Sequence, residues 1–118
     1  TMPGILGITF EEFVEKLQDS NTKVGKGDMI SRWGKPCCIA GHALKAMVLD
    51  HKDALGKRFP GQPINFRSLC KDTVTAITCL LIAFDLTLNQ AREIIRINDR
   101  NSTDRLRDLR DYAHLEHI

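Results

Sequence analysis

The stretch RWGKPCCIAGHALKAM, residues 32–47, contains the end of a cationic loop, RWGK, followed by the start of an expected apolar helix, PCCIAGHALKAM. Proline is favoured at the first position of a helix, so we expect a helix over residues 36–50. With about 100° of rotation per residue, one face of this helix is apolar. Cys38, His42 and Lys45 fall on the opposite face. The apolar face consists of Ile39, Ala40, Ala43, Leu44 and Met47.

Four further segments show the apolar periodicity of helices. Capping boxes, formed by Thr9 with Glu12 and by Thr87 with Gln90, predict where two of them begin. The nearly continuous apolar run at the end of the third helix predicts burial on all sides. We expect these helices at about residues 9–19, 69–84 (capped by Ser68) and 88–97, with a last one after Ser102 or Thr103.

The pattern predicts an all-α fold, with residues 1–118 forming a single compact domain of about five helices in an orthogonal or irregular bundle. A chain of this length buries a core without disulfides or metal ions. We expect residues 1–8 to form an N-terminal tail. Residues 20–35 and 52–66 are expected to be irregular basic loops, because the first has three glycines and the second has two glycines and two prolines.

Positive charge is concentrated in the middle of the chain. Residues 21–71 hold ten Lys and Arg against three Asp, a net charge of +7, whereas the whole chain carries +2. Cations interleaved with an aromatic residue suit a single-stranded nucleic acid or an acidic protein surface. The alternative is a solvated loop with its tryptophan in the core. The candidate partner-binding residues are Lys23, Lys26, Arg32, Trp33, Lys35, Lys57 and Arg58.

Cys38 and His42 lie four residues apart and predict a second candidate site. A cysteine in the first turn of a helix is favoured as a thiolate by the helix dipole. With His42 as base and Lys45 as electrostatic support, Cys38 would be the nucleophile of a small cysteine-dependent enzyme or redox protein. The competing interpretation is that Cys38 packs as a small apolar residue in the core.

A zinc-stabilised module is a third hypothesis. Cys38 and His42 would supply two of the four ligands, with Cys37, Cys70, His51 or an acidic residue completing the set. Structural zinc sites usually contain two compact ligand pairs, and the remaining cysteines are too widely spaced to form the second pair. We therefore expect neither a metal ion nor a cofactor.

Two stretches, WGKPCCIAGHALKA and REIIRINDRNSTDRLRDL, resemble a family of small uncharacterised helical proteins from phages and actinobacteria. The first is similar to the W-C-x-x-G-A-L segment of that family, with His42 inserted after the glycine. The second is similar to its W-N-D tail, with Ile97 in place of the aromatic residue. The resemblance implies a compact helical fold and a phage or bacterial origin. It assigns no role to Cys38, Gly41, Asn98 or Asp99.

Together these features favour a small non-enzymatic binding protein that engages an acidic protein surface or a nucleic acid. A phage-encoded, host-directed protein would fit the resemblance. We expect a cytoplasmic monomer or homodimer, because the N-terminus lacks a signal-peptide pattern and the four cysteines suggest no secreted disulfide framework. No apolar run approaches the roughly 20 residues of a membrane span.

Overall fold

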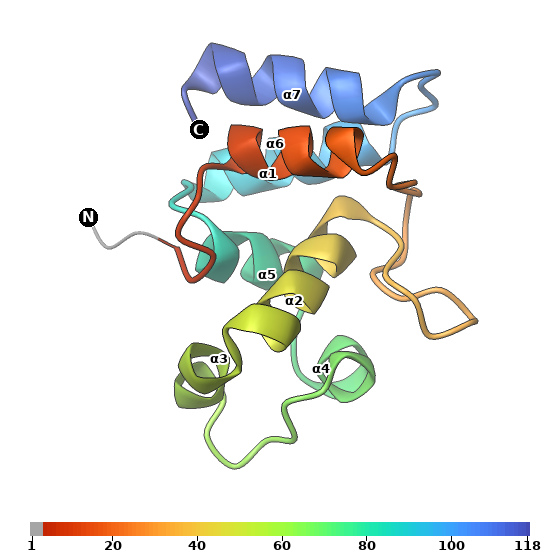
Figure 1. The fold of residues 1–118 in the computed structure, drawn as a ribbon. Helices are drawn as coiled ribbons and strands as arrows, with labels where there is room; N and C mark the ends of the chain where they lie inside the picture. The colour runs from red at the N-terminus through yellow and green to blue at the C-terminus, as the bar shows by residue number, and fades with distance from the viewer. Residues whose placement is uncertain (1–3) are drawn as a thin grey trace.

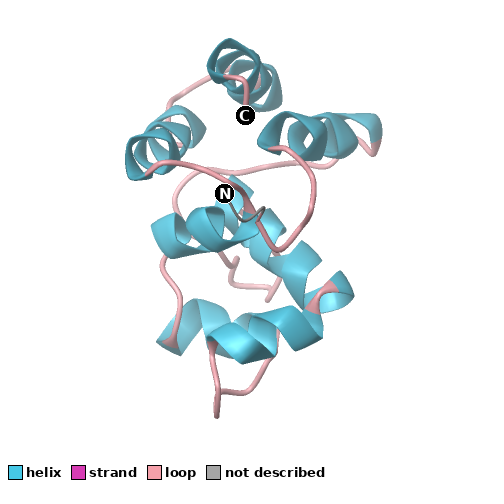
Figure 2. Ribbon diagram, turned by 90° about the vertical axis from the view of Figure 1, so that its left-hand side faces the viewer, coloured by secondary structure: helices cyan, strands magenta, loops and turns pink. Residues whose placement is uncertain are grey.

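The computed structural model describes residues 4–118, which form seven helices in three layers (Figures 1 and 2). The upper layer contains α1 (Phe10–Asp19), α6 (Leu88–Asn98) and α7 (Arg105–Glu116). The middle layer contains α2 (Ile39–Asp50) and α5 (Ala76–Ala83), and the lower layer contains α3 (Lys52–Arg58) and α4 (Phe66–Asp72).

The all-α class is confirmed, and the helices share one core. The Cα radius of gyration is 13.2 Å, close to the ~13.5 Å expected for a compact domain of this length. Helix α2 is central because it contacts α3, α4, α5 and α6. Phe84, after α5, packs against Phe10 and Phe13 of α1, with ring centroids 5.2 and 5.3 Å apart. Residues 4–118 contain no β-strand, only an isolated bridge between Ile30 and Pro36.

The expected helix over residues 69–84 is wrong, because the chain breaks into α4 and α5. The β-branched residues Thr73, Val74 and Thr75 interrupt it, and Thr75 turns outward to cap α5 by accepting a hydrogen bond from the Thr78 N–H at 3.2 Å. The threonine-rich composition disfavours a continuous helix, and the chain forms two separate helices instead. Asn65, rather than Ser68, caps α4.

The expected loop over residues 52–66 is also partly wrong, because its first half is α3. Leu55 is fully buried, and this burial stabilises a helix that contains Gly56. Both prolines, Pro60 and Pro63, lie after the helix, so they do not interrupt it. These two corrections raise the number of helices in residues 4–118 from about five to seven.

Helix α2 begins at Ile39 rather than near Pro36. Pro36 takes part in the bridge to Ile30, and the N–H groups of Cys37 and Cys38 donate to Met29 O and Asp28 O, each at 3.0 Å. These residues are therefore extended and paired with the preceding loop. Cys38 becomes the N-cap residue of α2.

Both ends of the described residues pack against helix termini. Residues 1–3 of the expected N-terminal tail lie outside the described residues, but Ile5 N donates to Ile82 O at 2.8 Å and satisfies a carbonyl near the end of α5. At the other end, the Ile118 carbonyl accepts a hydrogen bond from Phe10 N, the first N–H of α1. Helix α7 is capped by Asp104, not by Ser102 or Thr103.

Candidate functional site

Residues 23–35, here called the Trp33 loop, have a fixed backbone path beside α2. Gly25 N donates to Cys37 O at 2.9 Å, which adds to the two hydrogen bonds from Cys37 and Cys38. Ser31 closes the outer turn: its N–H donates to Lys35 O at 2.8 Å, and its hydroxyl accepts from the N–H groups of Trp33 and Lys35. Gly34, at φ +77°, supplies the left-handed residue that this turn requires.

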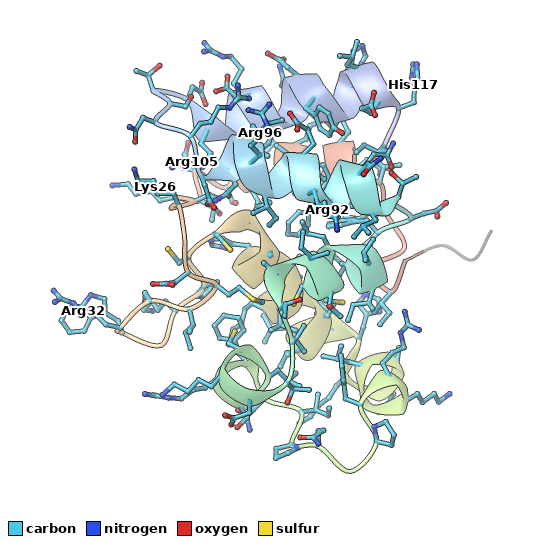
Figure 3. All side chains as sticks on the ribbon, turned by 180° about the vertical axis from the view of Figure 1, so that it is seen from behind. Lys26, Arg32, Arg92, Arg96, Arg105 and His117 are labelled. Atoms are coloured by element: carbon cyan, nitrogen blue, oxygen red, sulfur yellow. The ribbon has the colours of Figure 1, made fainter. Side chains whose placement is uncertain are left out.

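Trp33 lies at the outer end of this loop and points into solvent. Its side chain is 74% exposed, so the expectation that it could be tucked into the core is not met. The guanidinium carbon of Arg32 lies 4.6 Å from the centroid of the Trp33 ring, a cation–π stack. Figure 3 shows Arg32 at the far end of the projecting loop.

The loop also gathers the predicted cations. Lys23, Lys26, Arg32 and Lys35 are all exposed. None of these four forms an ion pair with another residue of the described chain. Lys26 instead donates to the neutral side chain of Asn101 at 2.6 Å.

Lys57 and Arg58 do not join this surface. They occupy the last turn of α3, and Figure 1 shows α3 on the opposite side of the molecule from the Trp33 loop. They line instead a groove of about 610 Å³ between α3 and the end of α5, whose floor includes Leu81 and Phe84. The structure therefore divides the predicted partner-binding residues into two separate groups.

The end of α6 holds the Trp33 loop in place. Asn98 is fully buried, and its Oδ1 accepts from Ile39 N at 3.0 Å while its Nδ2 donates to Gly25 O at 3.0 Å. Asp99 Oδ1 accepts from Gly27 N at 2.8 Å. One Asn-Asp pair thus fixes both the first N–H of α2 and two points of the loop.

Arg105 of α7 completes this attachment. Its guanidinium donates to Val24 O at 2.7 Å, to Arg100 O at 3.2 Å and to Asn98 O. We call Asn98, Asp99 and Arg105 the clasp. The guanidinium is occupied by carbonyl groups, so Arg105 positions the loop rather than offering a free cation to a partner.

Cys38 is buried, with 1% of its surface exposed. Burial raises the pKa of its thiol, and this effect outweighs the hydrogen bonds from the backbone of Gly41 and Ala40, which favour the thiolate. The burial of Cys38 agrees with the interpretation that it packs as a small apolar residue in the core. A neutral, inaccessible thiol does not suit a nucleophile.

The surroundings of His42 and Lys45, the other residues of the candidate thiol site, do not suit a base and an electrostatic support for Cys38. His42 Nε2 is buried and has no hydrogen-bond partner within residues 4–118. Burial lowers the pKa of His42, against the backbone of Lys23 and Cys37, which favours the charged form. Lys45 Nζ lies 5.6 Å from the centroid of the Phe66 ring on α4.

Burial also affects the thiols of Cys70 and Cys79. All four cysteines are free thiols. Burial raises the pKa of Cys79 strongly and that of Cys70 to about 11. Within residues 4–118, no three His, Cys, Asp or Glu side chains are grouped so that they could hold a metal ion. The described chain thus offers no ligand set for the zinc-stabilised alternative.

Sequence reasoning missed the clasp. Asn98 and Asp99 belong to the stretch REIIRINDRNSTDRLRDL, and Cys38 and Gly41 belong to the stretch WGKPCCIAGHALKA. The structure brings these stretches together, and a Cβ on Gly41 would lie 2.0 Å from Met29 O of the loop. These residues therefore serve the attachment of the loop to the helices.

Comparison with protein-family models, with curated proteins and with solved structures finds no match to this chain. The helices of residues 4–118 include none that is long and apolar enough to cross a lipid bilayer. The assignment of function consequently depends on the Trp33 loop and its surroundings.

Proposed function

We propose that this protein is a non-enzymatic binding protein that engages an acidic partner, a protein surface or a nucleic acid, through the Trp33 loop. The exposed position of Trp33 among four unpaired cations carries the proposal. Tryptophan and arginine dominate the energetics of binding interfaces, since each combines a large contact area with directional polar groups. An exposed indole buries little apolar surface on folding and so adds little to the stability of the fold. A role in binding would account for its position.

The attachment of the loop supports the same function. Binding usually costs free energy because flexible segments become ordered at the interface. Here the clasp and the backbone hydrogen bonds of the loop fix its path before a partner arrives. A partner would therefore meet a surface whose geometry is already set.

Retention on a heparin column tests whether the loop is an anion-binding surface. The loop variant combines Lys23→Glu, Lys26→Glu, Arg32→Glu and Lys35→Glu. The matched control combines Lys52→Glu, Lys57→Glu, Arg58→Glu and Arg110→Glu. Each set changes the net charge from +2 to −6, and circular dichroism checks that both variants keep the helical fold.

We expect the loop variant to lose retention, and the control to elute at a higher salt concentration than the loop variant. Equal elution of the two variants would show that net charge, rather than the Trp33 loop, governs binding. In that case the proposed function would lose its support.

A further inference from the structure

The side chains of Trp33 and Arg32 form a stack that exists before any ligand binds. The Arg32 guanidinium carbon lies 4.6 Å from the centroid of the Trp33 ring, and this cation–π contact favours one arrangement of the two side chains. Most of the indole stays exposed. A flat ligand that stacks on the indole therefore orders little additional side chain. Every nucleobase presents a flat π-face of this kind.

Unpaired cations lie on both sides of this stack along the chain. Lys35 follows Trp33 in the same turn, and Lys26 lies between the loop tip and the end of α6 (Figure 3). The contact between Lys26 and Asn101 places this lysine beside Arg100, which is exposed and has no ion pair among residues 4–118. A strand with a base on Trp33 would meet these cations along its phosphate backbone.

The surroundings of Trp33 favour a nucleic acid over a protein. A protein interface has a desolvated core of several apolar side chains. The other exposed large apolar residues of the described chain belong to α2, α6 and α7, not to the loop. They are Leu49, Leu88 and Leu115. Trp33 is thus an aromatic group surrounded by cations, the combination that suits unstacked bases and phosphates.

We propose that the Trp33 loop binds single-stranded nucleic acid, with one base stacked on the Trp33–Arg32 pair and phosphates contacted by Lys26 and Lys35. The strand is single because bases inside a duplex keep their faces covered by their neighbours. This inference rests on the proposed function and names the class of its partner.

The emission of Trp33 provides a direct test, because it is the sole tryptophan of the chain. We expect a twelve-residue oligothymidylate to quench this emission at 50 mM salt. With phosphates contacted by Lys26 and Lys35, the slope of log K against log salt concentration should be about −1 to −2. Poly-L-glutamate of matched charge and a twelve-base-pair duplex should bind more weakly.

Variants then separate stacking from charge, using the anisotropy of fluorescein-labelled oligothymidylate. We expect Trp33→Ala to lower the affinity about tenfold, since stacking contributes at this level, and Lys35→Glu to lower both the affinity and the salt slope. Lys57→Glu makes the same charge change on the opposite side of the molecule and should alter the affinity less than twofold. Trp33 is exposed, so its replacement leaves the fold intact.

Each remaining outcome has a definite meaning. If poly-L-glutamate bound as tightly as oligothymidylate, the partner would be an acidic protein, which overturns this inference and leaves the proposed function standing. If oligothymidylate bound equally well to wild type and Trp33→Ala, the stacking site would be refuted. If neither polymer bound and heparin retention did not depend on the loop, both proposals would fail.

Discussion

The side-chain oxygen of Asn98 accepts a hydrogen bond of 3.0 Å from the backbone N–H of Ile39, although 59 positions separate the two residues. This bond satisfies the first N–H of α2, which has no partner within its own helix. The amide nitrogen of Asn98 simultaneously donates to Gly25 O. A single buried side chain thus joins the end of α6, the start of α2 and the Trp33 loop.

Replacement of Asn98 by alanine should lower the free energy of unfolding by about 2–3 kcal/mol, because it leaves the buried Ile39 N–H and the partly buried Gly25 carbonyl without partners. Urea denaturation followed by circular dichroism measures this change. Asn101→Ala is the matched control: Asn101 is exposed and accepts only from Lys26. The control should change stability by less than about 0.5 kcal/mol. Equal effects of the two variants would contradict the role given to Asn98.

Gly41 and Gly56 should respond in opposite directions to alanine. Alanine is favoured over glycine within a helix by about 1 kcal/mol. At Gly41, however, the added Cβ would lie 2.0 Å from Met29 O, so the loop must move away from α2. At Gly56 the nearest atom is Ile64 Cγ1, at 3.8 Å. We expect thermal denaturation to show a lower melting temperature for Gly41→Ala and an unchanged or higher one for Gly56→Ala.

The thiols of Cys38, Cys70 and Cys79 should react slowly with Ellman's reagent in the folded protein at pH 8. With a pKa of about 11, only roughly 0.1% of Cys70 is thiolate at this pH, and Cys38 and Cys79 are also inaccessible. Denaturation should make these three thiols react rapidly. Fast modification of Cys38 before unfolding would revive the hypothesis of a thiol enzyme.

The same raised pKa values predict a loss of stability in alkali. The folded state holds the thiol protons more tightly than the unfolded state, whose thiols ionise near pH 9. The stabilisation is therefore complete below pH 9 and is lost as the pH rises from 9 towards 11. The urea concentration at the midpoint of unfolding, measured from pH 9 to pH 11, follows the effect. Cys79→Ala should make this midpoint fall less steeply with pH.

His42 should make the fold sensitive to acid. Burial lowers the pKa of His42 below 6.5, so the unfolded state takes up the proton first as the pH falls. The stability contributed by the neutral imidazole is thus present above pH 6.5 and is lost below it. Urea midpoints between pH 7 and pH 5 should fall for wild type and fall less for His42→Gln.

Local patterns in the sequence predicted the elements whose ends are marked by side chains. The capping boxes of Thr9 with Glu12 and of Thr87 with Gln90 both form, and they start α1 and α6 as expected. The break before Thr75 follows from local features, the β-branched residues 73–75 and the capping hydrogen bond of Thr75, which apolar periodicity outweighed in the prediction. The late start of α2 could not be predicted locally, because it depends on the pairing of Cys37 and Cys38 with the loop.

The candidate site was predicted only in part, for the same reason. Charge and aromatic content were sufficient to find Trp33 and its neighbouring cations. The separation of Lys57 from them could not be predicted, because it depends on where α3 packs. The burial of Cys38 agrees with the interpretation that it packs in the core, although the sequence alone left a reactive thiol open as an alternative.

The clasp has a consequence for how this surface can change. Asn98, Asp99 and Arg105 hold the loop through its main-chain atoms: Gly25 O, Gly27 N and Val24 O. None of these bonds depends on the side chains at positions 32, 33 or 35. Residues 32, 33 and 35 can therefore be exchanged by substitution while the loop keeps its path, so the chemistry of this surface can change without a change of the fold.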